Sequence, residues 1–350
     1  MQRVGRSIQG YGGEVSRPHP ATSPHAARDA AVAGHLSALS APAATFRHEA
    51  LLYAGPTDFL ERTTEFVLGA LERAEPILVM VPAAKLESLR ARLGRKAEDV
   101  SFVDMEKIGR NPARIIPAWH AFLSRSSRFD RPVNGIGEPI WPGRSPAELL
   151  ECQLHESLLN LAFAGGPAGR LLCPYDTDAL ESAVIEEALR SHPFHDGTQL
   201  VGTCPAYRDE PWLRGPFSQL LPEPSRPAAE LEFDRHGLAD VRSLVAREAE
   251  ASGLVPQRTS DLVLLAHELA ANSVRHAGGR GTVRLWMDDG SMICEVTDGG
   301  CIHDPMAGRR RPSPDAEGGR GLWLANQLSD LVQIRSSPAG TAVRLHLALS

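Results

Sequence analysis

The pattern of apolar and polar positions divides the chain into two regions. Between residues 45 and 204, short apolar runs alternate with segments whose apolar residues recur at helical spacing. The run at 76–82 is continuously apolar and bounded by prolines, which is typical of a strand covered on both faces. Strands that alternate with helices predict a parallel sheet with helices on both faces, so we expect an α/β fold here.

The elements expected in this first region alternate regularly. Strands are predicted at 50–53, 76–82, 100–104, 133–138 and 171–175. Helices are predicted at 59–74, 84–93, 112–126, 146–164 and 178–191. Thr57 and Asp58 are the expected cap of the first helix.

The second region, 229–350, has another pattern. It opens with an alternating segment at 229–233, and two helical patterns follow, at 238–252 and 257–276. Further strands are expected at 282–287, 292–297, 331–336 and 341–347, with a helix at 321–328. The last two strands are joined by a good hairpin turn, Ser337 to Gly340. This order predicts an α+β sandwich, with helices on a mostly antiparallel sheet.

Two further segments lack such patterns. Residues 1–44 are rich in turn formers and alanine and are expected to be a disordered tail. Six prolines break any regular element in 205–228, which we interpret as a linker. The predicted domains are therefore 45–204 and 229–350.

Composition excludes several classes of protein. With 37 Lys and Arg against 43 Asp and Glu, the net charge is -6, so direct binding to nucleic acid is not expected. Five cysteines at scattered spacings form no disulfide framework and favour a reducing cytoplasm. No apolar run is long enough to span a membrane, so a membrane association is not expected.

Chemistry-bearing residues gather in the second region, first on its long helix. Glu268, Asn272 and His276 are four residues apart and share one helix face. An amide oxygen can coordinate Mg²⁺, and a carboxylate one turn away can deprotonate a hydroxyl beside that cation. Taken alone, such a pair is more often part of a solvated helix face.

Two glycine-containing turns follow. Asp298, at the end of an apolar strand and before Gly299 and Gly300, can accept a hydrogen bond from an exocyclic amine such as that of adenine. Gly319 and Gly321 open a helix whose first N–H groups can bind an anion. Taken alone, the first is a plain turn and the second is weak evidence.

The order of these three features resembles the N box, G1 box and G2 box of the GHKL ATPases. It is most similar to the anti-sigma-factor serine/threonine kinases of that superfamily, whose domain is a Bergerat-type α+β sandwich. The matching residues are Glu268, Asn272, His276, Ala277, Asp298, Gly300, Gly319, Gly321 and Leu322. Thr341 also resembles a threonine near the end of the family's domain that contacts adenine.

The resemblance implies ATP and Mg²⁺ as cofactors. It implies that Asn272 holds the Mg²⁺ of ATP, that Asp298 contacts adenine, and that Glu268 is the catalytic base toward a serine. The remaining residues implied to bind nucleotide are His276, Gly300, Gly319, Arg320, Gly321, Leu322 and Thr341. Ile302 stands where many members have a second G1 glycine, which places turnover in question. Arg309, Arg310 and Arg311 either meet the γ-phosphate or an acidic partner, or form a solvated charge run.

The first region resembles the MEDS sensory domain, through residues 134–141, 151–156 and 171–176. That family is similar to a RecA-like α/β fold without its nucleotide loop, and the turn at 53–58 lacks a Gly-Lys-Ser/Thr sequence. Candidate residues of a ligand pocket are Glu138, Trp141, His155 and Tyr175. Cys152, His155 and Cys173 have spacing compatible with zinc or iron, although packed core residues are the commoner reading.

We therefore hypothesise an anti-sigma-factor regulator, in which a sensory domain controls an ATP-dependent serine/threonine kinase. The implied partners are a sigma factor and a STAS-type anti-anti-sigma protein, and a homodimer is left open. One alternative is a sensor histidine kinase, with a phosphoacceptor sequence starting at His155. Another is a nucleotide-gated module that captures a sigma factor without turnover.

Overall fold

The computed structural model describes residues 46–126, 131–166, 168–195, 204–208, 219–224, 226, 228–313 and 319–349. The tail predicted at 1–44 and much of the linker predicted at 205–228 lie outside these residues, so both stay predictions.

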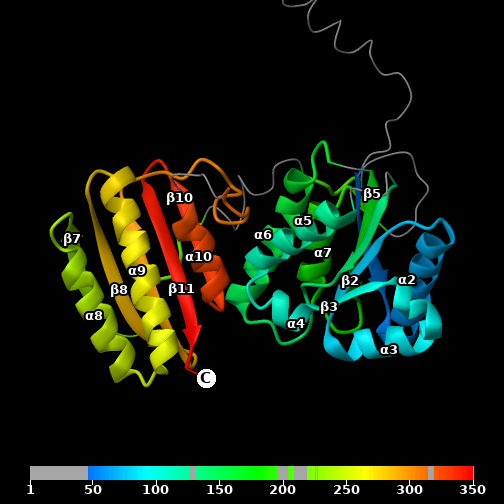
Figure 1. Ribbon diagram of the computed structural model, residues 1–350, viewed down its shortest axis with the longest axis horizontal. Helices are drawn as coiled ribbons and strands as arrows, with labels where there is room; N and C mark the ends of the chain where they lie inside the picture. Colours follow the sequence, from blue (N-terminus) through cyan, green and yellow to red (C-terminus); the bar gives the residue numbers. More distant parts are fainter. Residues whose placement is uncertain are drawn as a thin grey trace, which may run out of the picture. The chain divides into compact units, whose positions relative to one another are not determined.

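A parallel sheet forms the centre of the first domain (Figure 1). Its strands are β1 (Phe46–Tyr53), β2 (Ile77–Val81), β3 (Ser101–Asp104), β4 (Val133–Gly137), β5 (Gly169–Asp176) and β6 (Phe194–His195). They lie in the order β3-β2-β4-β5-β1-β6, and each pair is parallel. The predicted α/β class is confirmed.

Helices cover both faces of this sheet. They are α2 (Gly55–Glu72), α3 (Ala83–Leu93), α4 (Met105–Ile108), α5 (Ile115–Ser126), α6 (Pro146–Ala162) and α7 (Ser182–Ser191), with 3₁₀ turns at Gly94–Asp99 and Pro112–Arg114. Val79 and Val81 of β2 pack under α2 and α3, whereas Leu78 and Met80 pack under α5, α6 and α7. Because both faces of β2 are buried, its sequence is apolar throughout.

The start of α2 differs from the prediction. The helix begins at Gly55, with Ala54 as its N-cap and Pro56 in its first turn, where the missing N–H costs nothing. Asp58 lies inside this turn, and its Oδ2 accepts a hydrogen bond from the Ala54 N–H at 2.9 Å. The expected cap at Thr57 and Asp58 was therefore wrong.

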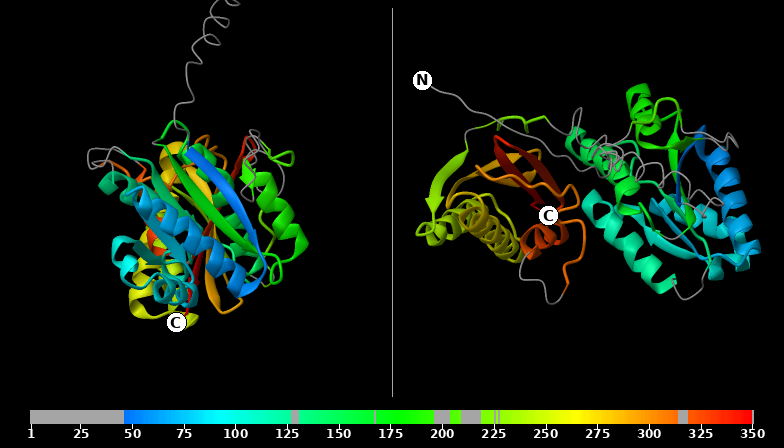
Figure 2. Two further views of the ribbon diagram at one scale, coloured as in Figure 1. Left: turned by 90° about the vertical axis from the view of Figure 1, so that its right-hand side faces the viewer. Right: turned by 90° about the horizontal axis from the view of Figure 1, so that it is seen from above.

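The second domain is an antiparallel sheet with helices on one face (Figure 2). Its strands are β7 (Ala229–Asp234), β8 (Arg280–Asp288), β9 (Ser291–Asp298), β10 (Leu331–Ser337) and β11 (Gly340–Ala348), in the order β10-β11-β9-β8-β7. Its helices are α8 (Leu238–Ala251), α9 (Pro256–His276) and α10 (Arg320–Leu328). The α+β class is confirmed.

The other face of this sheet is polar at its centre. Glu295 of β9 is buried and pairs with Arg284 of β8 and Arg344 of β11, each at 2.6 Å. The Arg344 guanidinium also donates to the carbonyl of Pro222 at 2.8 Å, which places part of the proline-rich segment against this face. The alternation of the strands thus separates an apolar core from a charged network.

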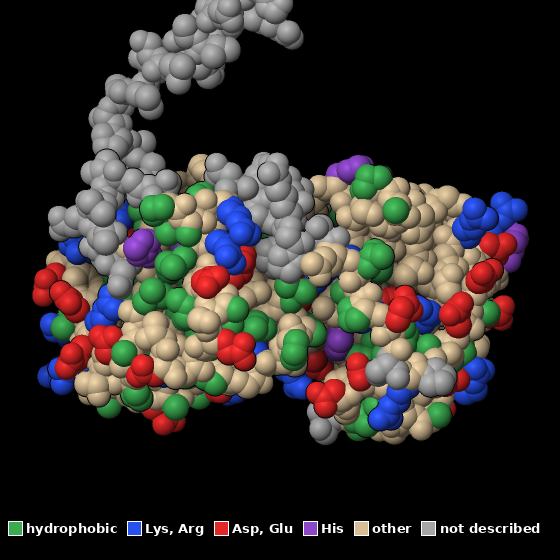
Figure 3. Space-filling view, turned by 180° about the vertical axis from the view of Figure 1, so that it is seen from behind, with side chains coloured by type: hydrophobic (Ala, Val, Ile, Leu, Met, Phe, Trp, Pro, Cys, Tyr) green, Lys and Arg blue, Asp and Glu red, His purple; other side chains and the backbone are tan. Residues whose placement is uncertain are grey.

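Two observations describe the surface. Acidic and basic side chains are interspersed over the described part of the face in Figure 3. None of the described helices combines the length and the apolar character that a membrane span requires.

Candidate functional site

Helix α9 presents Glu268 and Asn272 on one side and its apolar residues on the other. Leu262, Leu265 and Leu269 are buried in the core of the second domain. Glu268 and Asn272 are half-buried, and His276, the last residue of the helix, is exposed. The predicted row of side chains therefore exists, although its last member lies at the exposed end of the helix.

The first turn of α10 packs directly against this row. Gly321 is buried, and a Cβ added there would lie 2.8 Å from the Asn272 Nδ2 and 3.5 Å from the Glu268 Cβ. A larger residue would therefore displace the Asn272 amide. The structure brings together two motifs that are far apart in the sequence.

Gly319 precedes this turn as the N-cap of α10. Its φ is +81°, in the left-handed region that favours glycine. A glycine cap has no side chain to accept hydrogen bonds from the first N–H groups of the helix, so these donors are available to an anion. Arg320 begins the helix and is exposed, and Leu322 is half-buried.

Asp298 is held by hydrogen bonds on both carboxylate oxygens. Ser273, next to Asn272 on α9, donates to Oδ2 at 2.6 Å, and the Gly300 N–H donates to Oδ1 at 2.8 Å. Sequence reasoning missed Ser273, although its position beside Asn272 was a signal. Asp298 thus has a fixed orientation beside α9.

A chain of hydroxyl groups supports the turn after Asp298. The Ile302 N–H donates to Ser336 Oγ at 2.7 Å, Ser336 and Thr341 hydroxyls lie 2.7 Å apart, and Thr341 donates to the Gly300 carbonyl at 2.9 Å. Thr341 is also the register partner of Asp298 across β9 and β11. The residues predicted from the G1 turn and from the last strand therefore meet.

Two family models match the chain. Residues 47–193 match MEDS, the methanogen/methylotroph, DcmR sensory domain, and residues 231–347 match the histidine kinase-like ATPase domain. The chain carries a MEDS domain followed by a histidine kinase-like ATPase domain. The two matches confirm the resemblance of the first region to the MEDS domain and of the second region to the GHKL-type ATPase domain.

No curated protein is similar enough to this chain to count as a match. Among solved structures, the RsbU and RsbW domains of a Mycobacterium tuberculosis protein are similar, with 20% identity and a TM-score of 0.28. That match covers 35% of this chain, and the chain spans 33% of the solved one.

The ATPase family implies ATP, usually with Mg²⁺, and the residues present fit that group. Gly321 leaves the Asn272 amide space beside the first turn of α10, and Gly319 leaves that turn without a side-chain cap. Ile302 needs no glycine-like backbone, because its φ is not positive. Ile302, in place of the second G1 glycine, therefore introduces no backbone strain.

In the MEDS domain, the four candidate pocket residues do not form one group. Glu138 is buried and accepts a hydrogen bond from the Tyr53 hydroxyl at 2.8 Å. It also forms an ion pair with Lys85. Burial raises the pKa of Glu138 to about 7, against the opposing effect of Lys85. Tyr53 belongs to the core under α2 and α3, whereas Tyr175 packs on the other side of the sheet.

The remaining MEDS candidates lie under or near α6. His155 is buried, and burial lowers its pKa to about 3. Trp141 lies under the Arg144 guanidinium, 3.7 Å from the ring centroid. The Cys152 thiol faces the Pro139 carbonyl at 3.4 Å. Cys152, His155 and Cys173 therefore form no shared metal site, and Cys173 belongs to a different cluster.

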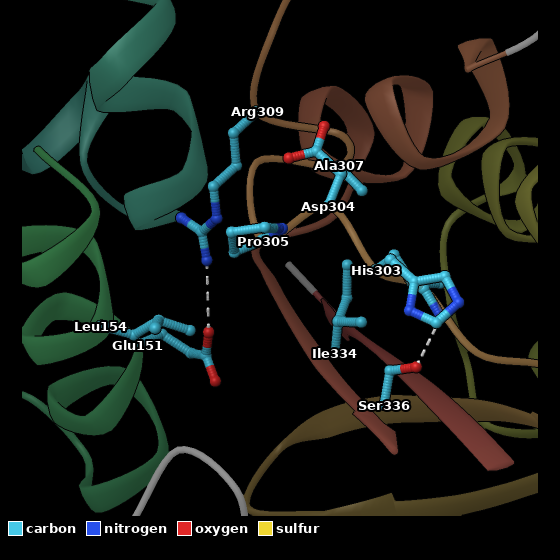
Figure 4. Close-up of a pocket in the computed structure, with 10 residues that line it drawn as sticks. Glu151, Leu154, His303, Asp304, Pro305, Ala307, Arg309, Ile334 and Ser336 are labelled. Atoms are coloured by element: carbon cyan, nitrogen blue, oxygen red, sulfur yellow. Dashed lines mark hydrogen bonds and ion pairs between the residues drawn. The ribbon is translucent and has the colours of Figure 1, made fainter. Parts of the chain in front are cut away.

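The described residues belong to one compact unit that begins at Ala44, and side chains of the two domains meet within it. Figure 4 shows Glu151 of α6 facing Arg309, with the two charged groups 3.5 Å apart. Arg335 of β10 lies 2.8 Å from the same carboxylate. Arg309 is buried in this contact, whereas Arg310 and Arg311 are exposed.

Proposed function

We propose that the chain is an anti-sigma-factor regulator whose ATPase domain is an ATP-dependent serine/threonine kinase. The observation that carries this proposal is the approach of Gly321 to Asn272 and Glu268. It sets a helix N-terminus, which favours phosphate, beside one amide and one carboxylate. That combination suits phosphoryl transfer, which depends on positioning and on charge stabilisation.

Each residue has a role in this proposal. The Asn272 amide oxygen holds the Mg²⁺ of ATP, and the N–H groups from Gly319 to Leu322 bind phosphate. Asp298 accepts a hydrogen bond from the adenine amine, Ser273 and Gly300 keep that carboxylate in place, and Thr341 contacts adenine beside it. Bound MgATP supplies the γ-phosphoryl group and neutralises phosphate charge. His276 and Arg320, both exposed, are proposed to bind nucleotide as well.

Glu268 is the proposed general base. Its carboxylate takes the proton of a serine hydroxyl on the partner protein as that oxygen bonds to the γ-phosphorus. The bond between the γ-phosphorus and the β–γ bridging oxygen breaks, and ADP leaves with that electron pair. The proposed phosphoryl acceptor is a STAS-type anti-anti-sigma protein. The proposed binding partner that the chain sequesters is a sigma factor.

Two observations bear on the alternatives. A histidine kinase starting at His155 needs an accessible imidazole, but His155 is only 1% exposed within α6. A binding module without turnover was favoured by Ile302, but the backbone at this residue needs no glycine. Both observations favour the serine kinase.

The test uses the full chain, ATP and Mg²⁺ with the STAS-domain proteins of the source organism. We expect acid-stable phosphate on a serine of one of them, located by mass spectrometry. Glu268→Gln should lower transfer by about a hundredfold or more while ATP binding persists. Glu250→Gln, on the exposed side of α8, is the matched control. Acid-labile phosphate, or transfer by Glu268→Gln at the native rate, would contradict the proposal.

A further inference from the structure

Four side chains with metal-binding chemistry converge in the core of the MEDS domain. They are His48 of β1, Glu156 of α6, Cys173 of β5 and His192, which follows α7. One ligand atom of each lies within 4.8 Å of the others. Each residue is at most 1% exposed. We call these residues the buried cluster.

The fold brings the buried cluster together from four segments. Strands β1 and β5 are parallel neighbours, with Ala50 opposite Cys173, so His48 and Cys173 lie on the same face of the sheet. Helices α6 and α7 cover that face. His192 is the C-cap of α7 and turns back toward Glu156.

Hydrogen bonds fix the tautomers of both histidines. The His192 Nδ1 lies 2.7 Å from the Ala188 carbonyl, which can only accept, so Nδ1 carries the proton. The His48 Nδ1 lies 3.1 Å from Asn160 Oδ1. Asn160 Nδ2 in turn donates to the Ser191 carbonyl at 2.8 Å, which orients Oδ1 toward His48. In their neutral forms, both histidines therefore turn an Nε2 lone pair toward the cluster.

These lone pairs face other electron-rich atoms. The His48 Nε2 lies 3.1 Å from Glu156 Oε2 and 3.3 Å from Cys173 Sγ. The His192 Nε2 lies 3.2 Å from the same oxygen, but it makes no hydrogen bond with it or with any other described residue. The His192 Nε2 is thus a buried polar atom without a hydrogen-bond partner among the described residues. A cation at the centre of the four atoms would give this nitrogen a partner.

We propose that the buried cluster binds one divalent cation of the Zn²⁺ type, through its two Nε2 atoms, its thiolate and its carboxylate. Four ligands of nitrogen, sulfur and oxygen suit tetrahedral Zn²⁺ better than Mg²⁺ or Ca²⁺, which prefer oxygen. The two negative ligands balance the charge of the cation, which a buried site requires. Binding releases the thiol proton of Cys173 to solvent and involves no change of oxidation state.

The first experiment is elemental analysis of the full chain, purified under reducing conditions without chelator. We expect about one equivalent of bound metal, with Zn²⁺ dominant. After removal of this metal, the chain is titrated with Co²⁺, which gives a thiolate-to-cobalt charge-transfer band and the strong visible bands of four-coordinate cobalt. Both should saturate at about one equivalent and disappear when Zn²⁺ is added.

Variants assign the site. Cys173→Ser should lose the charge-transfer band, and Cys294→Ser, which alters a buried thiol of the ATPase domain, should keep it. His192→Gln should weaken Co²⁺ binding at least tenfold. Circular dichroism reports whether each variant is folded. The Co²⁺ titration of the native chain tests the proposal even if a variant does not fold. The proposal is overturned if the native chain shows no thiolate–cobalt band with excess Co²⁺, or if the band survives Cys173→Ser.

Discussion

Arg335 Nη1 on β10 lies 2.8 Å from Glu151 Oε1 on α6, and both side chains are buried. Arg309 approaches the other oxygen of the same carboxylate at 3.5 Å. One sensory-domain carboxylate thus faces two arginines of the ATPase domain, and one of these lies in the loop that precedes α10. Glu151 thus joins α6 of the MEDS domain to β10 and to the loop that precedes α10.

Removing the charge of Glu151 should destabilise the chain. Glu151→Gln leaves two buried guanidinium groups without their carboxylate, so we expect a loss of about 3 kcal/mol in the free energy of unfolding. Glu186→Gln is the control, because Glu186 forms an exposed pair with Arg190 that is worth about 0.5 kcal/mol or less. Denaturant titration checks both variants. Equal stability of the two would show that the contact contributes nothing.

Enlarging Gly321 should weaken ATP binding. The Cβ of Gly321→Ala would lie 2.8 Å from Asn272 Nδ2, so the amide must move from its position. We expect about a tenfold loss of affinity for MgATP, measured by calorimetry. Gly69→Ala is a control on α2, where the added Cβ meets only the end of the Arg73 side chain, at 3.4 Å. If Gly321→Ala binds MgATP with native affinity, the first turn of α10 is not part of the nucleotide site.

Ser273 should position Asp298. Ser273→Ala removes the donor to Asp298 Oδ2, a charge-assisted hydrogen bond worth about 2 kcal/mol. Affinity for ATP should fall several-fold, since the carboxylate loses its orientation. Ser260→Ala on the same helix is the matched control, because Ser260 bonds only a backbone carbonyl, that of Pro256. Fluorescence of a labelled nucleotide provides the measurement, and an unchanged affinity in Ser273→Ala refutes the role.

Acid should destabilise the ATPase domain through His346. Burial, and then the charge of Arg344, lower the pKa of His346 from 6.5 to about 4, and its Nε2 lies 3.0 Å from Gln333 Oε1. The unfolded chain therefore binds more protons than the folded chain between these values. Stability from this group is complete above pH 6.5 and is lost as the pH falls toward 4, by about 3 kcal/mol.

His346→Gln tests this dependence. The free energy of unfolding is measured by urea titration from pH 7 to pH 4 for both proteins. The difference between native chain and variant should shrink as the pH falls, because the variant has no group that titrates there. A difference that stays constant with pH would exclude His346 as the source.

Local patterns predicted most of the fold. The apolar run of β2 and the i, i+4 row of α9 depend on periodicity alone, which the sequence displays directly. The start of α2 was misplaced, because proline in a first turn looks like a break in the sequence. Helix α7 begins at Ser182 rather than at 178, after a turn in which Asp176 accepts from the Asp178 N–H.

Contacts between distant segments could not be predicted in this way. The motif order suggested that Asn272 and Gly321 meet, and Ser273 stands next to Asn272, but only the folded chain brings Ser273 to Asp298 and Arg309 to Glu151. The buried cluster was missed for the same reason. Its members come from four elements, and only the paired register of β1 with β5 brings His48 close to Cys173.

Calorimetric titration of the full chain with a non-hydrolysable ATP analogue and Mg²⁺ tests the nucleotide site most directly. We expect binding at about one equivalent, a preference for ATP over GTP, loss of binding in Asp298→Asn, and native binding in Asp240→Asn, which alters an exposed carboxylate of α8. Absence of heat, or equal affinity for the two nucleotides, would contradict the proposed nucleotide site.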